Sequence, residues 1–578
     1  MLHLTRWVMV FCAVGVMLGG CASAATPGAP TSGDASNRSS QATAPKTLQL
    51  ALQGFQEPKS GIMEPSGVGS GGFDPLEHFL IFHSSMTVYD PQGRLIPRLA
   101  EKVPSLDDGD WKVLPDGRME VTWRLRPNLQ WHDGTALSAE DFVFSSQIVK
   151  DPEVPATRPA WGPLVMGALA PDARTLVLVW KESSFLGGGT GAGDLAALPR
   201  HRLADLYQAG DKQAFVNSPY WTTEFIGLGP YKLAQWQRGS FIEGQAFDQY
   251  VLGRPKTDRI LIKYVGDVNA IVAGMLSGDL DIVPMGTRFD SGQVVAVRDA
   301  WGPDGGMAMV VPFGIRTVWL QFRDPNAPWV RDVRVRRALA HATDRQGMSD
   351  ALQYGLTPPA DTFVMLEDLA FRLVDAQGLA RYPYDVNRAW QLLAEAGWTM
   401  GADNTLHDRS GQPLALDVSA TGQGSNVQEI ETVASQWQSA GFHTSVVPLP
   451  PQAANLDERK NTVPGAFVWP WSPNLTAPQN LITAQVSSER TAWKGRNYGG
   501  YSSAAYDALY DRFAGFLQPE ARDRATADIM KLIADDLPVI PIYYYGTGVV
   551  TRKGVKGPGA LTPMQTASAW NIETWETR

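Results

Sequence analysis

Residues with the chemistry of a catalytic or metal site are few and scattered in this sequence. The tripeptide His132-Asp133-Gly134 joins a base to a carboxylate, but its glycine favours a turn in which the aspartate accepts local backbone amides. The eight histidines show no metal-ligand spacing, and the sequence has no Gly-x-Ser-x-Gly elbow, Walker loop or His-Glu-x-x-His motif. We therefore predict no catalytic centre and no metal site. Two carboxylates that meet in space would still be compatible with glycoside hydrolysis.

One glycine pattern, Gly67-x-Gly69-x-x-Gly72, matches the dinucleotide fingerprint by its letters. That fingerprint binds a pyrophosphate where a strand turns into a helix, and the sequence predicts neither element around these glycines. We expect no dinucleotide and no other cofactor.

The only two cysteines, Cys12 and Cys21, lie close to the N-terminus. Arg6 precedes an apolar stretch at residues 7–17 that is too short to cross a bilayer, which is typical of a secretory signal. The sequence Leu-Gly-Gly-Cys at residues 18–21 resembles the bacterial lipobox, whose cysteine receives a lipid after cleavage. We predict a signal peptide at residues 1–20 and lipidation of Cys21; the alternative is an ordinary signal peptide with an incidental cysteine. The mature chain would then have no intramolecular disulfide.

Composition limits the remaining function classes. Residues 21–46 are rich in Ala, Thr, Ser, Gly and Pro and predict a flexible tether after the lipidated cysteine. The formal net charge of −9 argues against nucleic acid as a partner. No later stretch approaches 18 uninterrupted apolar residues, so we expect a soluble body of two or three lobes. The 19 tryptophans suit both a core and a ligand cleft.

Strand-like and helix-like segments alternate along the chain, which indicates an α/β fold. Strands are predicted at residues 47–53, 118–125, 259–265 and 280–283, and at residues 537–545, where prolines suggest an edge or an irregular strand. Helices are predicted at residues 138–148, 267–277, 332–341, 385–396 and 503–513. Ser138 and Asp141 have the spacing of a capping box. The glycine-rich residues 187–193 predict a mobile surface loop.

Five groups of motifs, in this order, resemble family 5 of the bacterial extracellular solute-binding proteins, the peptide, nickel and oligosaccharide group of ABC importers. They are YDPQG and IPRLAE at residues 89–101; WRLRP, WHDG and SAED at residues 123–141; GLGPYKL, NA and GDLD at residues 227–281; DVRVRRAL and DR at residues 332–345; and YD with LLAEAG at residues 384–397. The second group is the most specific. Together they extend the resemblance over about residues 48–545, and we interpret most of them as scaffold. The arginines of DVRVRRAL are expected to form inter-lobe salt bridges or a solvated face rather than an anion site.

The resemblance implies a large, type II periplasmic-binding-protein-like fold with two lobes, a hinge between them and an extra subdomain. We expect lobe 1 at residues 47–73, 215–310 and 535–578, the extra subdomain at residues 74–214, and lobe 2 at residues 311–534. The implied function is capture of a peptide, oligosaccharide or other small organic solute by a monomer in the periplasm or on the outer face of the cytoplasmic membrane. The protein would deliver the solute to an ABC permease in the inner membrane. A surface lipoprotein that senses or scaffolds without importing remains an alternative, and a hydrolase is the least favoured.

The ligand site is predicted where this sequence departs from the family pattern. Peptide-binding members have an acidic segment whose aspartate pairs with the peptide α-ammonium, whereas residues 464–485 contain no Asp or Glu. Trp469 and Trp471 stand there instead, either as stacking surfaces for a ligand or as core residues. Asn474 is predicted either to bond ligand hydroxyls or to form a turn. Tyr498 and Phe73 complete the predicted ligand-binding residues, Phe73 because its region lines the cleft in the family.

Overall fold

A ten-stranded sheet runs through the described part of this computed structural model, which comprises residues 45–58, 73–154, 161–422, 425–453, 455–559, 561 and 567–577. The predicted signal peptide, Cys21, most of the tether and Gly67 to Gly72 lie outside these residues. In order across the sheet, the strands are β16 (His443–Leu449), β15 (Ala415–Thr421), β17 (Gly465–Trp471), β12 (Met307–Leu320), β18 (Val539–Thr551), β11 (Ile282–Val283), β1 (Thr47–Gln53), β10 (Arg259–Val265), β9 (Phe241–Ala246) and β8 (Tyr231–Gln237).

The predicted strand-helix-strand unit is confirmed at one end of this sheet. Strands β10 and β11 both pair in parallel with β1, and α5 (Val268–Ser277) connects them. The carboxylate of Asp267 caps α5 by accepting the amide of Asn269 at 2.8 Å. Gly278 ends the helix at φ +84°, a backbone conformation that glycine adopts without a steric penalty. Local sequence signals therefore determine this unit.

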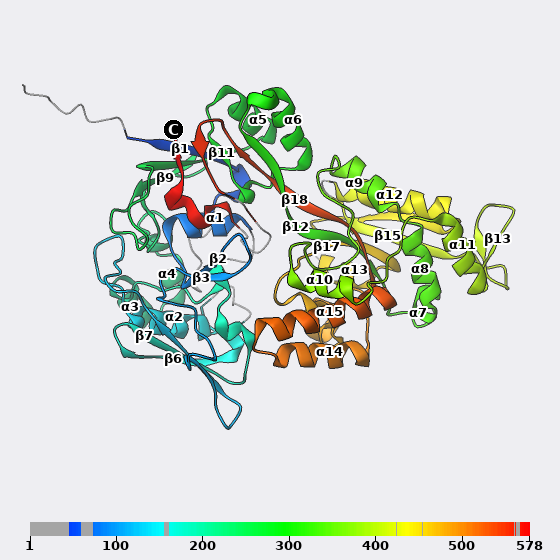
Figure 1. Cartoon of the computed structure of the whole chain (residues 1–578), viewed down its shortest axis with the longest axis horizontal. Helices are drawn as coiled ribbons and strands as arrows, with labels where there is room; N and C mark the ends of the chain where they lie inside the picture. The colour runs from blue at the N-terminus through cyan, green and yellow to red at the C-terminus, as the bar shows by residue number, and fades with distance from the viewer. Residues whose placement is uncertain are drawn as a thin grey trace, which may run out of the picture. The chain divides into compact units, whose positions relative to one another are not determined.

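Two long strands, β12 and β18, run through both halves of the sheet (Figure 1). They pair antiparallel with each other, and their register shifts at residues 312–314 and 316–317 of β12. The C-terminal residues of β12, Ile315 to Leu320, also pair with β17. The C-terminal residues of β18, Val550 and Thr551, also pair with β11. The two strands thus connect the half of the sheet that contains β1 with the half that contains β17.

The prediction of an edge or an irregular strand at residues 537–545 is confirmed in its second alternative. Consecutive partners of Arg316 and Thr317 are Tyr543 and Pro541, so one residue of β18 has no partner in β12. Strand β18 as a whole lies between β12 and β11, but β11 pairs only with Val550 and Thr551. In the described part of the chain, residues 539–545 therefore have β12 on one side and only an isolated bridge from Tyr543 to Pro359 on the other. The bulge accommodates a proline, which has no amide proton for the ladder.

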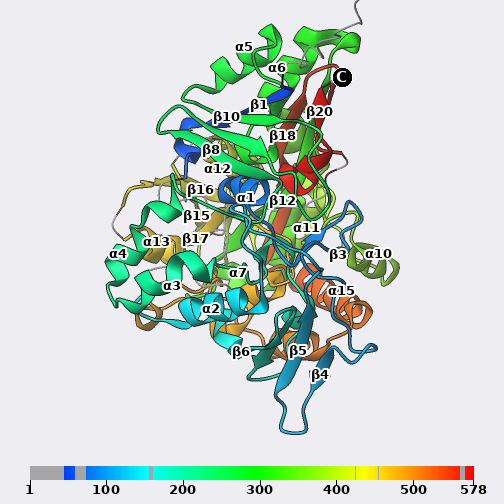
Figure 2. The ribbon, with the colours of Figure 1, turned by 90° about the vertical axis from the view of Figure 1, so that its left-hand side faces the viewer.

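A separate four-stranded sheet contains β4 (Trp111–Val113), β5 (Met119–Arg124), β7 (Thr175–Trp180) and β6 (Val165–Asp172). Helix α2 (Ala139–Lys150) packs on it and begins with the predicted capping box, in which the amide of Ser138 donates to the Asp141 carboxylate at 3.0 Å. Figure 2 shows this sheet with α2 and α3 (Arg200–Gln208) beside it.

The prediction of a mobile surface loop at residues 187–193 is wrong. The backbone of these residues packs against the four-stranded sheet and against β2 (Thr87–Tyr89). A Cβ atom added to Gly187 would lie 2.7 Å from the Met119 side chain, and one added to Gly188 would lie 2.8 Å from Trp111. The glycines allow the chain to approach the sheet closely, which explains the composition without mobility.

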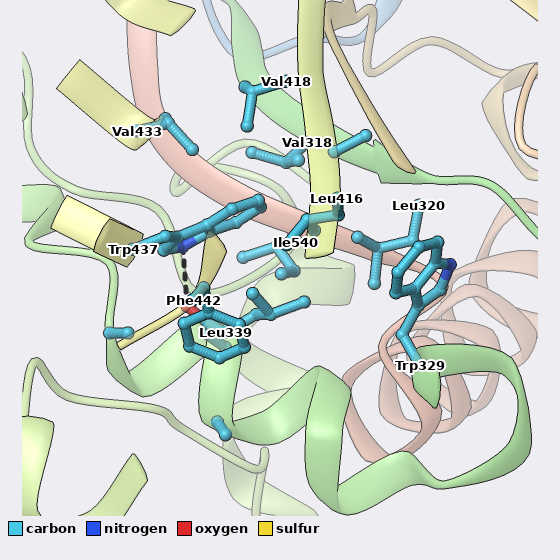
Figure 3. Close-up of a cluster of buried hydrophobic side chains, with 14 of the residues drawn as sticks. Val318, Leu320, Trp329, Leu339, Leu416, Val418, Val433, Trp437, Phe442 and Ile540 are labelled. Carbon is cyan, nitrogen blue, oxygen red and sulfur yellow. Dashed lines mark hydrogen bonds between the residues drawn. The ribbon is translucent and has the colours of Figure 1, made fainter. Parts of the chain in front are cut away.

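The half of the sheet that contains β15 and β17 is covered by α8 (Val333–His341), α11 (Val386–Glu395) and α12 (Asn426–Ser439), as Figure 3 shows for their shared core. Trp437 is fully buried there and donates its indole N–H to the carbonyl of Leu339 at 3.2 Å. Arg336 of α8 pairs with Asp536 and donates to the carbonyl of Trp329 at 2.6 Å, while Arg334 pairs with Asp332. Arg334 and Arg336 therefore form salt bridges, and Arg337 donates to the carbonyl of Asp535. The predicted inter-lobe position of such salt bridges stays a prediction.

The remaining elements complete the structure. They are α1 (Phe73–Phe82), α4 (Lys212–Val216), α6 (Ser291–Trp301), α7 (Pro328–Arg331), α9 (Arg345–Leu352), α10 (Leu369–Ala376), α13 (Leu456–Thr462), α14 (Ala504–Gly515), α15 (Pro519–Asp536), β3 (Leu95–Pro97), β13 (Thr399–Met400), β14 (Leu406–His407), β19 (Val555–Lys556) and β20 (Glu576–Thr577). Among the described residues, every helix is too short or too polar to cross a membrane. The lobe boundaries stay a prediction.

Candidate functional site

Aromatic side chains gather on one face of β12 and β17, and we call Trp319, Phe467, Trp469, Trp471 and Tyr498 the aromatic cluster. Trp319 and Trp471 stack with ring centroids 5.5 Å apart and an interplanar angle of 26°. Tyr498 meets Trp319 edge to face at 5.3 Å and Trp469 at 6.2 Å. These separations are typical of favourable aromatic pairs, so the cluster is a continuous packed surface.

The strand pairing explains why these residues meet. Because side chains alternate between the faces of a strand, Thr317 and Trp319 of β12 share a face, and so do Trp469 and Trp471 of β17. The two strands are antiparallel, with Thr317 opposite Trp469, and the Thr317 hydroxyl donates to the Trp469 carbonyl at 2.6 Å. Sequence reasoning missed Trp319; the alternation of Ile315, Thr317 and Trp319 was the signal for it.

Burial divides the predicted ligand residues of the cluster into two groups. Trp471 is 1% exposed and contacts Phe363 at 5.0 Å, so the structure places it in the core. Trp469 and Tyr498 are half-buried at the margin of the same hydrophobic cluster. An incoming ligand can therefore reach Trp469 and Tyr498 without a change in the core.

The margin of the aromatic cluster bears a positive charge. Lys460 of α13 places its ammonium 4.6 Å from the centroid of the Trp469 ring, within the range of a cation–π contact. Its carboxylate neighbour is Asp457, at 3.8 Å. Burial raises the pKa of the Tyr498 phenol, which Arg496 opposes, so the hydroxyl is protonated at neutral pH and can donate a hydrogen bond.

Two hydrogen-bond donors within the aromatic cluster lack acceptors among the described residues. They are the indole N–H groups of Trp319 and Trp471, both buried. An unsatisfied buried donor destabilises the folded state by about 1–3 kcal/mol, so such groups are commonly satisfied by water or a ligand. Because both indoles are enclosed in the core, a ligand at Trp469 and Tyr498 does not reach these two donors in this structure.

Of the other two predicted ligand residues, Asn474 lies outside this cluster. Asn474 is exposed, and its side-chain carbonyl accepts the amide and the hydroxyl of Thr476, each at 2.9 Å, as in a turn. Phe73 is the first residue of α1, and its side chain lies outside the described part of the structure. The structure therefore brings together three of the five predicted residues.

The His132-Asp133-Gly134 tripeptide forms the predicted turn. Gly134 has φ +88°, and Asp133 accepts the amide of Thr135 at 3.0 Å. His132 accepts the amide of Gly227 through Nδ1 at 3.0 Å and donates from Nε2 to the carbonyl of Gly229 at 3.0 Å. Burial lowers the pKa of His132 to about 4, so the ring is neutral and holds the Gly-Leu-Gly-Pro turn in place.

A buried charge network lies on the other side of the crossing strands. Arg316 of β12 pairs with Glu429 of α12, which also accepts the hydroxyl of Tyr543 of β18. Asn426 accepts a second hydrogen bond from Arg316 at 3.0 Å. Sequence reasoning missed this network, because 113 residues separate Arg316 from Glu429 and neither lies in a recognisable motif. It ties both crossing strands to α12.

The described residues contain no group of three or more His, Cys, Asp or Glu side chains that could hold a metal ion together. The residues of the aromatic cluster carry no nucleophile paired with a base. What this arrangement can do chemically is bind: it presents flat apolar faces, one cation and several donors.

Comparisons with known proteins agree with this picture. The family model described as "Bacterial extracellular solute-binding proteins, family 5 Middle" matches residues 94–493. The oligopeptide-binding protein AppA of Bacillus subtilis is 24% identical over 93% of this chain and 94% of its own, and the dipeptide-binding protein of Escherichia coli is 24% identical over 80% and 83%. The crystal structure of NikA from Brucella suis with Fe(III)-EDTA superposes with a TM-score of 0.71 at 18% identity, covering 92% of this chain and 100% of that one.

Proposed function

Because the chain belongs to family 5 of the bacterial extracellular solute-binding proteins, we propose that it is the substrate-binding component of an ABC importer. It has the two-lobed fold of that family. It captures a peptide, oligosaccharide or other small organic solute outside the cytoplasm and delivers it to the permease. The protein binds the solute without making or breaking bonds in it. The importer's ATPase supplies the energy for transport. Two of its relatives are named as an oligopeptide-binding and a dipeptide-binding protein, which supports a ligand of the size of a short peptide.

Membrane attachment is part of this proposal. The protein is a monomer held by a lipid on Cys21, with residues 22–46 as the tether between the lipid and the folded body. The Leu-Gly-Gly-Cys sequence and the composition of the tether support it. The body itself stays in the periplasm or at the outer face of the cytoplasmic membrane.

The single observation that carries the ligand assignment is the chemistry of the aromatic cluster. Trp469 and Tyr498 are accessible, Lys460 supplies a cation beside them, and residues 464–485 contain no carboxylate. The carboxylate beside this margin, Asp457, already has Lys460 as its charge partner at 3.8 Å. A ligand ammonium enclosed there would meet the Lys460 cation, which is unfavourable in a desolvated site. The cluster instead suits an apolar, aromatic or sugar face that stacks on the indole.

The expected motion is hinge closure about β12 and β18, which are the strands shared by both halves of the large sheet. Mass spectrometry of the denatured protein identifies the small molecule that co-purifies with it. That molecule is then added back to the stripped protein during small-angle scattering. We expect the radius of gyration to fall at saturation. Unchanged dimensions at full occupancy, or recovery of the molecule in a chemically altered form, would contradict the proposal.

Replacing Trp469 with alanine tests the accessible half of the cluster. We expect the Kd for the co-purified molecule to rise about tenfold, because one stacking face is lost, with little change in Tm. Trp471→Ala is the matched control: it empties a core position and is expected to lower Tm more than Trp469→Ala does. The assignment is wrong if Trp469→Ala changes only Tm and leaves the Kd as it was.

A further inference from the structure

One aromatic contact joins a segment that packs on the four-stranded sheet to helix α14, and both of its rings belong to one hydrophobic cluster. Phe185 begins the 3₁₀ turn Phe185–Gly188, in the glycine-rich segment that packs on the four-stranded sheet. Its ring centroid lies 5.3 Å from that of Phe513 of α14, at an interplanar angle of 65°. Figures 1 and 2 both show α15, the helix that follows α14, close to the part of the chain that contains the four-stranded sheet.

The third partner of this contact is Arg522 of α15. Its guanidinium carbon lies 5.0 Å from the centroid of the Phe185 ring. The positive charge of the guanidinium is attracted to the electron-rich face of that ring. The carbonyl of Leu517 accepts a hydrogen bond from Arg522 at 2.7 Å and fixes the guanidinium in place. Burial lowers the pKa of Arg522, and Tyr89 and two neighbouring carboxylates oppose this effect, so the cation persists.

Each side inserts an apolar side chain into the core of the other. Phe185 is 9% exposed and belongs to the hydrophobic cluster that contains Trp319 and Trp471, which are residues of the crossing strand β12 and of β17. In return, Leu517 packs against the cluster formed by the four-stranded sheet and α2. Two residues after Phe185 the backbone lies directly on the four-stranded sheet, where a Cβ atom at Gly187 would come within 2.7 Å of the Met119 side chain.

The geometry points to a clasp, formed by Phe185, Phe513 and Arg522, that holds the closed conformation and sets how much of it exists without ligand. This inference rests on the proposed hinge closure and adds the residues that control it. In the closed conformation the edge-to-face pair and the cation–π contact are made, as they are in this structure, and opening breaks both. Since apparent affinity scales with the population of the binding-competent state, the clasp tunes both capture and release without touching the solute.

The chain contains a matched control for this contact. Phe322 meets Tyr501 edge to face at 5.3 Å and an angle of 74°, and the guanidinium of Arg336 lies 5.4 Å from its centroid. Phe322 and Tyr501 belong to the hydrophobic clusters of the half of the large sheet that contains β15 and β17, and Arg336 lies on α8, which covers that same half. All three residues therefore come from one part of the structure. Phe322→Ala therefore removes the same chemistry without affecting closure.

The test compares small-angle scattering of the stripped, ligand-free full chain with that of Phe185→Ala, Arg522→Gln and Phe322→Ala. We expect the ratio of closed to open molecules to fall about tenfold in Phe185→Ala and about threefold in Arg522→Gln. Arg522→Gln retains the apolar packing, so it still reports if Phe185→Ala folds poorly. Phe322→Ala should lower Tm and leave the scattering unchanged.

The clasp is overturned if Arg522→Gln and every folded Phe185 variant scatter like the parent protein. That outcome is separate from a failure of the proposed function, which would show as no contraction of the parent protein when the co-purified molecule is added. A parent that contracts, with variants that keep its free-state scattering, would leave the importer role intact and remove only the clasp.

Discussion

Replacing Glu429 with alanine is expected to lower the free energy of unfolding by about 3–5 kcal/mol. Glu429 is 1% exposed and Arg316 8%, so the substitution leaves a guanidinium enclosed without its counter-charge. The hydroxyl of Tyr543 loses its acceptor in the same step. Because Arg316 and Tyr543 lie on the two crossing strands, the loss affects the junction between the two halves of the sheet. Urea denaturation followed by tryptophan fluorescence measures it.

Two controls separate a buried ion pair from charge in general. Asp116→Ala breaks the exposed pair with Arg118, which joins a 53% exposed to a 45% exposed side chain, and should leave the free energy of unfolding nearly unchanged. The double variant Arg316→Met with Glu429→Leu removes both charges and should recover most of the loss. If Glu429→Ala is no worse than Asp116→Ala, the network does not stabilise the junction.

Local sequence patterns were sufficient to predict the elements whose signals lie within a few residues of one another. The pattern of residues 259–277 predicted a strand and a helix that the structure contains, and Asp267 and Gly278 lie at the two ends of that helix. The Ser138–Asp141 capping box is another case. In each, the hydrogen bonds that decide the structure join residues only a few positions apart.

Elements that depend on distant partners were not predictable in this way. The order of strands places β18 between β12 and β11, which come from separate parts of the chain, and β11 pairs only with Val550 and Thr551. The prolines signal an irregular strand correctly, but no local pattern gives the partners of a strand or how far along it each partner extends. The glycines of residues 187–193 have the same ambiguity between flexibility and close approach, which only the position of Trp111 and Met119 resolves.

The candidate site shows the same division. The sequence drew attention to Trp469 and Trp471 through a missing carboxylate, and left open whether they face a ligand or the core. The pairing of β12 with β17 separates them: Trp471 is enclosed against Trp319, while Trp469 stays at the margin beside Lys460. Burial is decided by strand register, which one sequence without its partner strand does not reveal.

Acid conditions should destabilise the protein through its buried histidines, with His132 as the measurable case. Burial lowers the pKa of His132 to about 4 and that of His83 to about 3, from an ordinary value near 6.5. The unfolded chain therefore binds more protons than the folded one between pH 6.5 and pH 4. Stability from each ring is complete above pH 6.5 and is lost as the pH falls toward the folded pKa. For His132 this amounts to ~3 kcal/mol.

The comparison must be made between variants, because other buried groups act in the opposite direction. Burial raises the pKa of Glu77 to about 7 and that of Asp194 to about 6, so their contribution to stability grows as the pH falls through the same range. Subtracting a His132→Asn curve from the parent curve removes these shared terms. His443→Asn, at an exposed position of β16, is the matched control for the substitution itself.

Unfolding free energies at pH 7.5, 6, 5 and 4 should therefore separate the proteins progressively. We expect His132→Asn to be less stable than the parent at pH 7.5, where it loses a ring that bonds both Gly227 and Gly229, and to close most of that gap by pH 4. The gap closes because the parent loses stability as the pH falls: its fold requires the neutral His132 imidazole, whereas acid favours the protonated form. The variant has no imidazole at this position and does not lose this stability. A gap that is constant with pH would mean that the His132 ring is protonated without penalty, and the turn it holds would then owe its position to packing alone.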